Sequence, residues 1–585
     1  MERRRPKPWR TQDFQLPEHE GRSKVNALDR AIRQTVKPGM VLYIGSGANA
    51  ALRALLRQFH GTKPEFTLVM PALSLSAIHL LHAGLVKRIV TAYYGAGYYP
   101  TTGPSPVIQE LNRKGKVELE SWSLLSLTQR LMAGALGLPF LPTRSLQGSS
   151  MAEENQRSFS LIEDPFGSGI EVGAVKALNP DIALVHGWAA DHYGFTITAP
   201  AIESGDCLWG TKASKGGAVV SVEKVVSTDF IRRHAPLVTI PGHMVAAVCE
   251  ASMGAHPEAM VRVGVEGLRA YEHDFEFLRD CRNASLNPRS LDAWLREWVL
   301  DCPHENYIRK LGAERISALQ RQAQGSVALA QIPRQEGWND TEMMLVAAAR
   351  EVERLVMERG YALIISGLGL PSLVSWLAYY QLRNKGIDID LMTGTGFVGF
   401  APRPGDTLPL SMSNLATSKM VTDIVDCQGV FVGGRNSRCL TVLNAAQVDR
   451  FGNLNSSLTA EGALLVGSGG ANDAANAPDV LVVIPQSAER FVERLPYITT
   501  PGVRVQTLVS DMGIFEKHGS GAEFMLVRYF TGHGQADATA ALARIRKNCG
   551  WQPRAAPALA LVPPPTPREL MLLRNLDPQG HVRGA

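Results

Sequence analysis

The stretch Met40-Val41-Leu42-Tyr43-Ile44-Gly45-Ser46-Gly47 is an apolar strand signal followed at once by a glycine turn, and residues 50–59 then follow a helical pattern. The same plan returns at residues 361–365, where a second apolar run leads to Gly367-Leu368-Gly369 and a helical pattern over residues 372–380. Apolar strands that alternate with helices indicate a mostly parallel sheet covered by helices on both faces. The sequence therefore predicts an α/β protein with two similar domains in tandem.

A second matched pair of segments supports this repeat. Residues 182–186 lead to Ala190-Asp191-His192-Tyr193-Gly194, and residues 442–446 lead to Val448-Asp449-Arg450-Phe451-Gly452. In both places an apolar run ends at a short polar stretch that closes on glycine. The two halves are interpreted as two copies of one plan.

The break between the copies is placed at residues 321–340, a linker in which helical periodicity is lost. We expect a basic N-terminal arm over residues 1–24, a first α/β domain over residues 25–320 and a second over residues 341–550. Residues 551–585 are rich in proline and are predicted to form an extended arm or a flexible tail.

The composition is that of a soluble globular protein of several domains, with 585 residues of which 45% are hydrophobic and 20% charged. The net charge of +5 is a mild excess that argues against nucleic-acid binding. The sequence shows neither the apolar core of a signal peptide nor a run long enough to cross a membrane, so we expect a cytoplasmic protein. The seven cysteines are scattered and never at C-x-x-C spacing, which predicts neither a metal site nor a disulfide framework.

Glycine turns between a strand and a helix are the candidate ligand-binding elements, because their backbone N–H groups can hold a phosphate or a developing oxyanion. Gly45-Ser46-Gly47 and Gly367-Leu368-Gly369 fit this pattern, and each fits a tight turn without ligand equally well. Gly467-Ser468-Gly469-Gly470-Ala471-Asn472 is the stronger candidate, since three glycines in four positions allow very close approach of a ligand to the backbone. The sequence contains no dinucleotide fingerprint, no phosphate-loop motif and no G-x-S-x-G, so nicotinamide chemistry, nucleotide hydrolysis and hydrolase triads lose support.

Several stretches resemble glutaconate CoA-transferase, a family I CoA-transferase. Residues 442–457 and 467–473 resemble its β subunit, and residues 135–143 and 241–245 look like its α subunit. The similarity runs from about residue 25 to residue 527, so the chain resembles an α–β fusion. The resemblance implies an acyl-CoA and a small carboxylic or dicarboxylic acid as substrates, coenzyme A as the cosubstrate, no metal, and a homo-oligomer.

The resemblance also raises a conflict about the catalytic nucleophile. Family members use a glutamate of the β subunit, which forms a mixed anhydride and then a glutamyl-CoA thioester. The matching strand of this chain, residues 390–396, contains no glutamate. Aligning Thr395 and Gly396 with the family's Ser-Gly places Gly394 at the nucleophile position, and a shift by one residue gives Thr393. Asp390 lies about 13 Å up the strand by its rise and is not expected to substitute.

Three functions remain open from the sequence. The first is transfer of CoA or acyl through a ternary complex or an unrecognised carboxylate. The corresponding turn of the first half, residues 93–97, contains no carboxylate that could replace the glutamate. The second is hydrolysis or carbon–carbon bond cleavage of an acyl-CoA, with water activated by a base such as His186, Asp449 or Glu461. The third is a non-catalytic scaffold, against which the ligand-binding glycine turns argue.

Overall fold

The computed structural model describes residues 21–95, 103–199, 208–261, 264–324, 336–405, 407–518, 521–531 and 537–584. Most of the predicted basic arm and the predicted exposed linker near Gly325 lie outside the described residues. Helix α12 (Ala313–Gln322) precedes that gap, and α13 (Asp340–Arg359) follows it. No helix in the described ranges is long and apolar enough to cross a bilayer.

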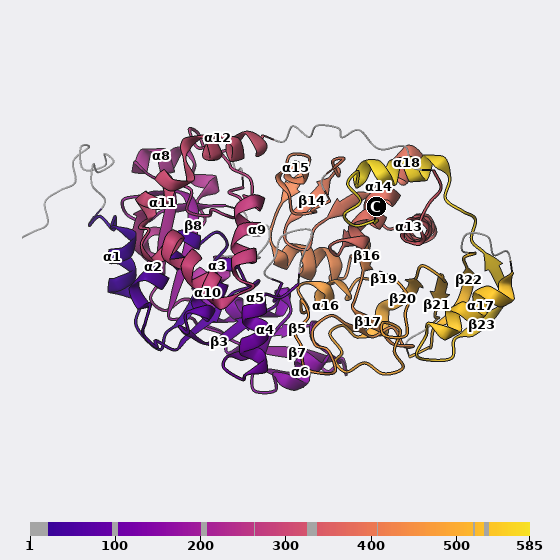
Figure 1. Ribbon diagram of the computed structural model, residues 1–585. Helices are drawn as coiled ribbons and strands as arrows, with labels where there is room; N and C mark the ends of the chain where they lie inside the picture. Colours follow the sequence, from indigo (N-terminus) through magenta and orange to yellow (C-terminus); the bar gives the residue numbers. More distant parts are fainter. Residues whose placement is uncertain are drawn as a thin grey trace, which may run out of the picture.

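Two large sheets form the two halves of the molecule, which lie side by side in Figure 1. The first sheet has the spatial order β11 (Val245–Glu250), β10 (Ala218–Val226), β8 (Ile182–Asp191), β1 (Val41–Ile44), β2 (Phe66–Val69), β3 (Val86–Thr91) and β4 (Glu118–Ser121), with β9 (Thr196–Thr198) paired to β8. The second has the order β15 (Met420–Val421), β14 (Phe397–Phe400), β13 (Asp390–Met392), β12 (Leu363–Ser366), β16 (Cys439–Leu443), β19 (Asp479–Val483), β20 (Val505–Val509), β21 (Gly513–Glu516), β22 (Met525–Tyr529) and β23 (Arg554–Leu561).

Both sheets share one strand order, which confirms the predicted pair of similar α/β domains. When the strands of each half are numbered in the order in which they occur along the chain, the path from β11 to β4 and the path from β20 to β15 have the same spatial order. One difference lies at β13 and β14, which are antiparallel, whereas their counterparts β2 and β3 are parallel. Helix α3 (Leu75–His82) connects β2 to β3, but only residues 393–396 separate β13 from β14, too few for a parallel crossover.

The shared order also corrects one sequence-based correspondence. Because β13 is the counterpart of β2, the turn that carries Gly394 corresponds to residues 70–74, which follow β2. The match to residues 93–97 is wrong, since these residues follow β3, and residues 96 and 97 lie outside the described chain. Ala72 and Tyr93, one from each of these two segments, both reach the interface with the second half.

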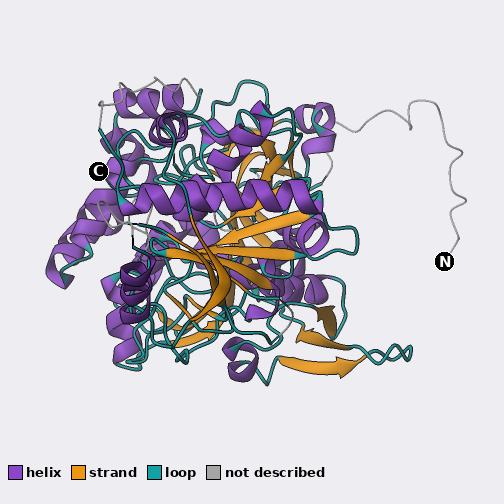
Figure 2. Cartoon of the chain, turned by 90° about the vertical axis from the view of Figure 1, so that its right-hand side faces the viewer, coloured by secondary structure: helices purple, strands orange, loops and turns teal. Residues whose placement is uncertain are grey.

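Helices cover both faces of each sheet, as predicted. In the first half, α1 (Leu28–Thr35), α2 (Asn49–Phe59) and α3 pack on one face, and α5 (Leu124–Ala135) and α7 (Leu208–Ala213) pack on the other. In the second half, α13 and α14 (Leu370–Asn384) cover one face, while η5 (Val425–Val432) and α17 (Ala538–Lys547) cover the other. Figure 2 shows a long helix lying across the twisted strands of this half.

The remaining elements surround these layers. They are α4 (Pro106–Arg113), β5 (Phe140–Thr143), α6 (Ser150–Glu154), β6 (Phe159–Glu163), β7 (Glu171–Lys176), α8 (Thr228–Arg233), η2 (Ala235–Leu237), η3 (Gly242–Met244), α9 (Phe275–Ala284), α10 (Pro288–Leu295), η4 (Arg296–Leu300), α11 (His304–Leu311), α15 (Met412–Leu415), β17 (Gln447–Val448), β18 (Leu454–Asn455), α16 (Ala471–Ala474), η6 (Gly502–Arg504) and α18 (Pro567–Leu576). Strands β5, β7 and β6 form a small antiparallel sheet of the first half that lies next to the second half in Figure 1.

The matched polar turns confirm that the halves repeat one plan at the level of hydrogen bonds. Asp191 Oδ1 accepts the N–H groups of Tyr193 and Phe195, at 3.0 and 2.9 Å. Asp449 Oδ1 accepts the N–H groups of Phe451 and Asn453, at 2.9 and 3.0 Å. In each half a buried carboxylate therefore accepts the backbone N–H groups of the turn that follows the apolar run.

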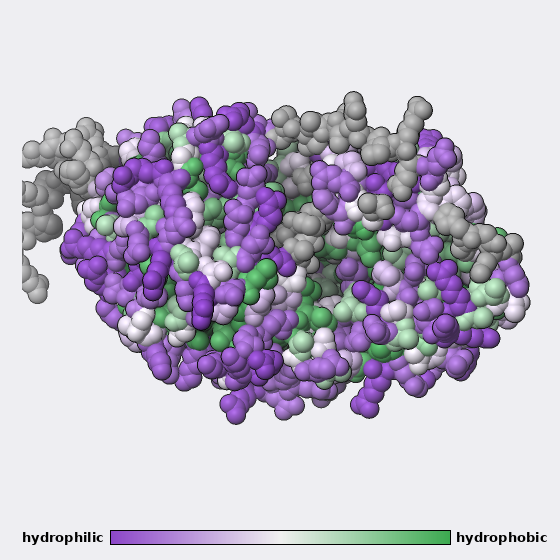
Figure 3. Space-filling view, viewed as in Figure 1, coloured by the Kyte–Doolittle hydropathy of each residue, from purple (hydrophilic) through white to green (hydrophobic). Residues whose placement is uncertain are grey.

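The two halves are interlocked by apolar contacts. Leu124 and Leu125 of α5 pack against Ile424 and Val425, at the start of η5. Tyr497 of the second half belongs to the core that lies between the first sheet and α5. Figure 3 shows hydrophobic residues at the waist between the halves, on a face that is otherwise mostly hydrophilic.

The prediction of an extended arm or flexible tail over residues 551–585 is wrong. This segment adds the edge strand β23 to the second sheet and then forms helix α18, which packs on α13 and α14. Pro567 occupies the first turn of α18, where a missing N–H is tolerated, and Thr566 and Glu569 close a capping box around it. The prolines therefore begin a helix and occupy a sheet edge, two positions that suit proline in folded proteins.

A buried ion pair fixes α18 to α13. Arg574 donates to both oxygens of Glu342, at 2.8 and 2.9 Å, and the Glu342 side chain is 0% exposed. Arg574→Met leaves this carboxylate without its main partner, so we expect the free energy of unfolding to fall by about 3 to 5 kcal/mol, measured by denaturant titration. The control is Arg568→Met at an exposed position of the same helix, and an equal loss in both variants would contradict the assignment.

Candidate active site between the two halves

A cavity of about 260 Å³ lies between the two halves. Its first-half wall consists of Ala72, Tyr93 and Leu124, and its second-half wall is built from the ends of β12, β13 and β16 and the turn before α16. The predicted site residues that line it are Gly367, Thr393, Gly394, Thr395, Gly467, Ser468, Gly469, Gly470 and Ala471. The glycine turns of the second half and the nucleophile position therefore meet at one place.

The described residues of the cavity wall carry no charge. Among the described residues that line it, none has a carboxylate, imidazole, thiol, ammonium or guanidinium group. Asp390 is not one of them and pairs instead with Lys419, whose Nζ lies 2.7 Å from its Oδ1. The polar groups of the wall are hydroxyls, carboxamides and backbone amides, which can hold a substrate but cannot form the acyl-glutamyl anhydride.

Gln428 occupies the space that a glutamate side chain would need. It belongs to η5, a stretch of π-helix, and is 2% exposed. A Cβ built on Gly394 would lie 2.3 Å from its Nε2 atom, and a Cβ built on Gly470 would lie 2.6 Å away. Nε2 donates to the Gly394 carbonyl at 3.4 Å, a weak bond, and Oε1 is buried without a partner among the described residues. A neutral carboxamide therefore fills the space beside Gly394, the predicted nucleophile position.

Other polar groups of the wall are available to a ligand. The Asn444 carboxamide and the Ser366 and Ser456 hydroxyls line the cavity and form no hydrogen bond with any described residue. The N–H groups of Gly394 and Gly470 likewise donate to no acceptor in the described part of the chain. Such donors, held rigidly around a carbonyl, stabilise the oxyanion that forms when a thioester is attacked.

The glycine turn before α16 joins the two halves. Gly469 donates its N–H to Ala92 O and accepts from Leu124 N–H, both at 2.9 Å. Gly467 and Gly469 have φ values of +92° and +50°, which are accessible to glycine without strain. The predicted ligand turn is thus also a backbone joint. Asn472 does not line the cavity: its Oδ1 accepts from Leu146 N–H at 2.8 Å and its Nδ2 donates to Thr499 O at 2.9 Å.

The same joint contains a fully buried carboxylate, Asp473. Its Oδ1 accepts from Ser123 Oγ at 2.6 Å and Ser145 Oγ at 2.7 Å, and its Oδ2 accepts from Leu125 N–H at 2.9 Å. All three donors belong to the first half. Burial raises the pKa of Asp473 to about 6, although these hydrogen bonds oppose the shift.

The glycine turn of the first half lies elsewhere. Ser46 and Gly47 line a separate small cavity of about 20 Å³ within the first half, together with His186. Gly47 N–H donates to Glu258 Oε2 at 3.3 Å, so this turn already holds a carboxylate of its own chain. Gly45 N–H donates to Leu184 O at 2.9 Å, and neither Gly45 nor Gly369 lines the cavity between the halves.

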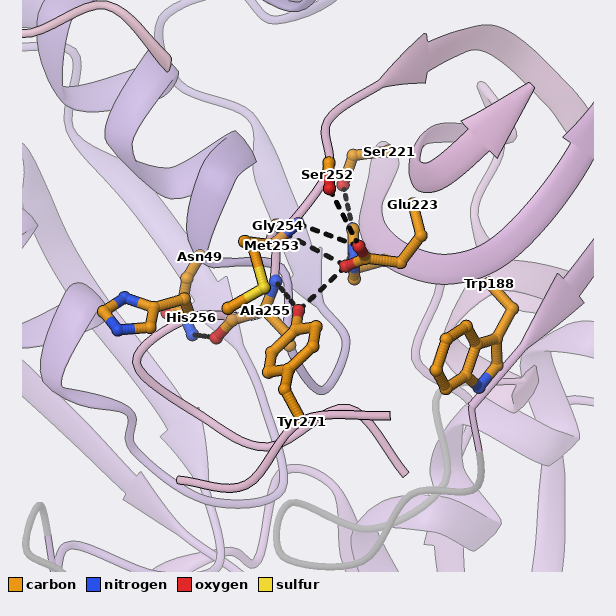
Figure 4. Close-up of polar contacts among 12 residues, drawn as sticks. Asn49, Trp188, Ser221, Glu223, Ser252, Met253, Gly254, Ala255, His256 and Tyr271 are labelled. Carbon is orange, nitrogen blue, oxygen red and sulfur yellow. Dashed lines mark hydrogen bonds and ion pairs between the residues drawn. The ribbon is translucent and has the colours of Figure 1, made fainter. Parts of the chain in front are cut away.

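His186 is hydrogen-bonded to Ser221 and Glu223, and Figure 4 shows the further contacts that surround Glu223. Its Nδ1 lies 2.9 Å from Ser221 Oγ and its Nε2 lies 3.0 Å from Glu223 Oε1. The Glu223 carboxylate also accepts from Tyr271 Oη and Met253 N–H, both at 2.8 Å. Both imidazole nitrogens have hydrogen-bond partners and the His186 side chain is 0% exposed. This arrangement fits a structural role beside the turn at Ser46 and Gly47 better than the role of a base.

The other two predicted bases are also outside the cavity. Asp449 closes its own turn, and its Oδ2 accepts from Asn453 Nδ2 at 2.8 Å. Glu461 is exposed in the loop between Leu458 and Leu464. Neither lines the cavity, so the structure brings no predicted base to the nucleophile position. No group of three or more His, Cys, Asp or Glu residues able to hold a metal ion occurs in the described ranges.

Comparison with known proteins identifies the family. The profile described as Coenzyme A transferase matches residues 25–251. The A-type chain of glutaconate CoA-transferase from Acidaminococcus fermentans is 30% identical over 253 residues, 40% of this chain and 75% of the relative. The B-type chain of 3-oxoadipate CoA-transferase from Pseudomonas knackmussii is 30% identical over 264 residues, 41% of this chain and 94% of the relative. The IpdA chain of the cholesterol ring-cleaving hydrolase from Mycobacterium tuberculosis is 30% identical over 247 residues, 40% of this chain and 80% of the relative.

A solved structure covers both halves at once. The acyl-CoA transferase from E. coli O157:H7, in a thioester complex with CoA, covers 94% of this chain and 96% of its own with a TM-score of 0.62 and 18% identity. At that identity the likeness concerns the fold. The chain belongs to the coenzyme A transferase family, with the two subunit types fused in one chain, and it is a transferase-type enzyme.

Sequence reasoning missed Gln428 and Asn444. Asn444 lies within the stretch that resembles the β subunit, directly after strand β16, where a polar residue could have drawn attention. Gln428 gave a weaker signal, a single amide within the largely apolar run of η5, and only packing brings it to Gly394. A π-helical stretch is frequent at functional sites, but the sequence does not reveal it.

The position of Gln428 predicts how a glutamate can be restored. Gly394→Glu alone places its Cβ against Nε2 of Gln428, and the carboxamide must turn away to make room, so we expect less covalent adduct from this variant than from one with a smaller residue at position 428. Gly394→Glu combined with Gln428→Ala provides the room, and incubation with acetyl-CoA should then give a glutamyl-CoA adduct, detected by intact mass spectrometry. The control is Gln428→Ala alone, which should give no adduct. As much adduct in the single Gly394→Glu variant as in the double variant, or none in a folded double variant, would contradict this geometry.

Asp473 predicts a pH-dependent joint. Its folded pKa of about 6 lies above the usual value for aspartate, so its contribution to stability is present in acid and is lost as pH rises through 6. Relative to Asp473→Asn, the wild type should therefore lose up to about 3 kcal/mol of stability between pH 4 and pH 8. Thermal unfolding across this pH range measures the difference, with the exposed Asp280→Asn as control. Parallel profiles for wild type and Asp473→Asn would show that the joint does not titrate there.

Proposed function

We propose that the chain transfers CoA between carboxylic acids by direct reaction of two substrates in the cavity between its halves, without an acyl-enzyme carboxylate. The observation that carries this proposal is the absence of a charged side chain among the described residues of the cavity wall, in which Gln428 fills the space next to Gly394. Membership of the coenzyme A transferase family supports an acyl-CoA thioester as the substrate class. The small carboxylic or dicarboxylic acid expected from the sequence is the acceptor.

The proposed route needs no base from the protein. The acceptor carboxylate, already ionised at neutral pH, attacks the thioester carbonyl carbon, and the CoA thiolate leaves, which gives a mixed anhydride of the two acids. The thiolate then attacks the acceptor's carbonyl carbon, and the donor acid leaves as a carboxylate. Asn444 and the N–H groups of Gly394 and Gly470 hold the oxyanion of each step.

Hydrolysis is the second candidate, favoured by the similarity to IpdA, whose name describes a ring-cleaving hydrolase. Water, unlike a carboxylate, must lose a proton to become a good nucleophile, and a positioned base usually takes it. The cavity wall contains no imidazole or carboxylate for this task among the residues described. The geometry therefore supports transfer better than hydrolysis.

Initial-rate kinetics with a panel of acyl-CoAs, with and without free acids, test the proposal. We expect CoA exchange only when an acid is present, with intersecting double-reciprocal lines because both substrates bind before reaction. Borohydride after incubation with acyl-CoA should reduce no aspartate or glutamate of the protein to its alcohol. Thioester loss without acid would establish hydrolysis, and parallel lines with a reduced carboxylate would establish a covalent nucleophile elsewhere in the chain.

Two further expectations belong to this proposal. The cytoplasm remains the expected compartment, supported by six cysteines, all free, in the described part of the chain. The homo-oligomer stays a prediction that sedimentation of the purified protein would test.

A further inference from the structure

A second cavity of about 220 Å³ adjoins the first at the boundary between the halves. Gln428 lines both cavities, so they meet at this residue. The first half contributes the end of β5 and part of α5 to its wall, and the second half contributes Gly429, Gly433 and Asn476. The second cavity therefore adjoins the residue that lies beside Gly394, the position at which the thioester is proposed to react.

The wall of the second cavity favours an anion. Arg144 lines it and uses one of its guanidinium nitrogens to donate to Gly433 O, which leaves its other N–H groups without a partner among described residues. Gln129 and Asn476 add carboxamides, and no aspartate or glutamate lines this wall within the described ranges. A guanidinium that faces no acidic neighbour suits a carboxylate, which it can bind with two parallel hydrogen bonds.

The side chain of Gln428 is held weakly. Gln428 Oε1 is buried without a partner, and its Nε2 has only the 3.4 Å contact with Gly394 O among described residues. An unsatisfied buried amide is costly, so the side chain gains by turning to a ligand that offers hydrogen bonds. Gly429, the next residue, has only side-chain atoms at 3.8 Å or more around the place of a Cβ, which leaves space beside Gln428.

We propose that the second cavity binds the carboxylate of the acceptor acid through Arg144, and that Gln428 is a movable partition between this acid and the thioester. The proposal rests on the proposed function, because it names the place of the second substrate. Phosphates of CoA are the other source of an anion. They lie at the far end of the long pantetheine chain, whereas this cavity shares Gln428 with the cavity of the reacting position.

Equilibrium binding to the full chain tests the assignment without requiring turnover. Acetate and succinate are titrated into wild type, Arg144→Gln and the exposed control Arg157→Gln, and acetyl-CoA is titrated separately into each. We expect Arg144→Gln to weaken acid binding at least tenfold while the affinity for acetyl-CoA stays within threefold of wild type. Arg157→Gln should change neither, and thermal unfolding confirms that the variants remain folded.

Each other outcome overturns the assignment. Acid affinities that are absent in wild type or unchanged in Arg144→Gln would place the acceptor elsewhere. A parallel loss of acetyl-CoA affinity would assign the guanidinium to the phosphates of CoA. Failure of the proposed function is a separate result, because it would appear as a wild type that binds no acetyl-CoA or catalyses no exchange while Arg144-dependent acid binding persists.

Discussion

The cavity depends on the joint made by the turn before α16. Gly469 is bonded through its backbone to Ala92 and Leu124, and Asp473 accepts three hydrogen bonds from the first half a few residues later. The same turn supplies Gly470 to the cavity wall. Any movement that opens the joint also displaces the atoms proposed to hold the oxyanion, so binding geometry and domain packing are parts of one constraint.

This double use explains why the glycines were only partly interpretable from the sequence. Close backbone approach was predicted for Gly467, Gly469 and Gly470, and the structure shows close approach. The approaching partner at Gly469 is the backbone of the first half, however, and not only a ligand. A glycine cluster indicates that something must come near, but the sequence does not say whether it is a substrate or another part of the chain.

Most of the fold was predictable because its signals are local. The strand and glycine-turn plan at Met40–Gly47 and its copy at residues 361–369 are short-range patterns, and both became β-strands followed by helices. The direction of β14 was not predictable in this way, since it depends on the short turn at residues 393–396 being too small for a crossover. The C-terminal prolines led to a wrong prediction for a related reason. A proline at the start of a helix cannot be told from one in a disordered tail by local pattern, and α18 is held in place by the distant ion pair between Arg574 and Glu342.

The candidate site was predictable only where a resemblance fixed a position. Gly394 was placed by alignment and does lie at the cavity. Gln428, which occupies the space beside Gly394, belongs to a different element and is brought there by packing. The predicted bases His186 and Asp449 failed for the opposite reason. A polar residue at the end of an apolar strand is equally suited to close a turn, and both residues are hydrogen-bonded within their own half. Local pattern identifies such a residue without deciding between the two roles.

Replacing a carboxylate by a carboxamide next to Gly394 changes which substrates can be present together. An enzyme carboxylate at this point would repel an acceptor carboxylate at close range, since like charges in a partly buried site interact strongly. A neutral Gln428 removes that repulsion and still offers a donor and an acceptor to the reacting groups. In the proposed route the acceptor can therefore occupy its cavity while the thioester is bound, and the acceptor's own charge performs the attack that the family assigns to its glutamate.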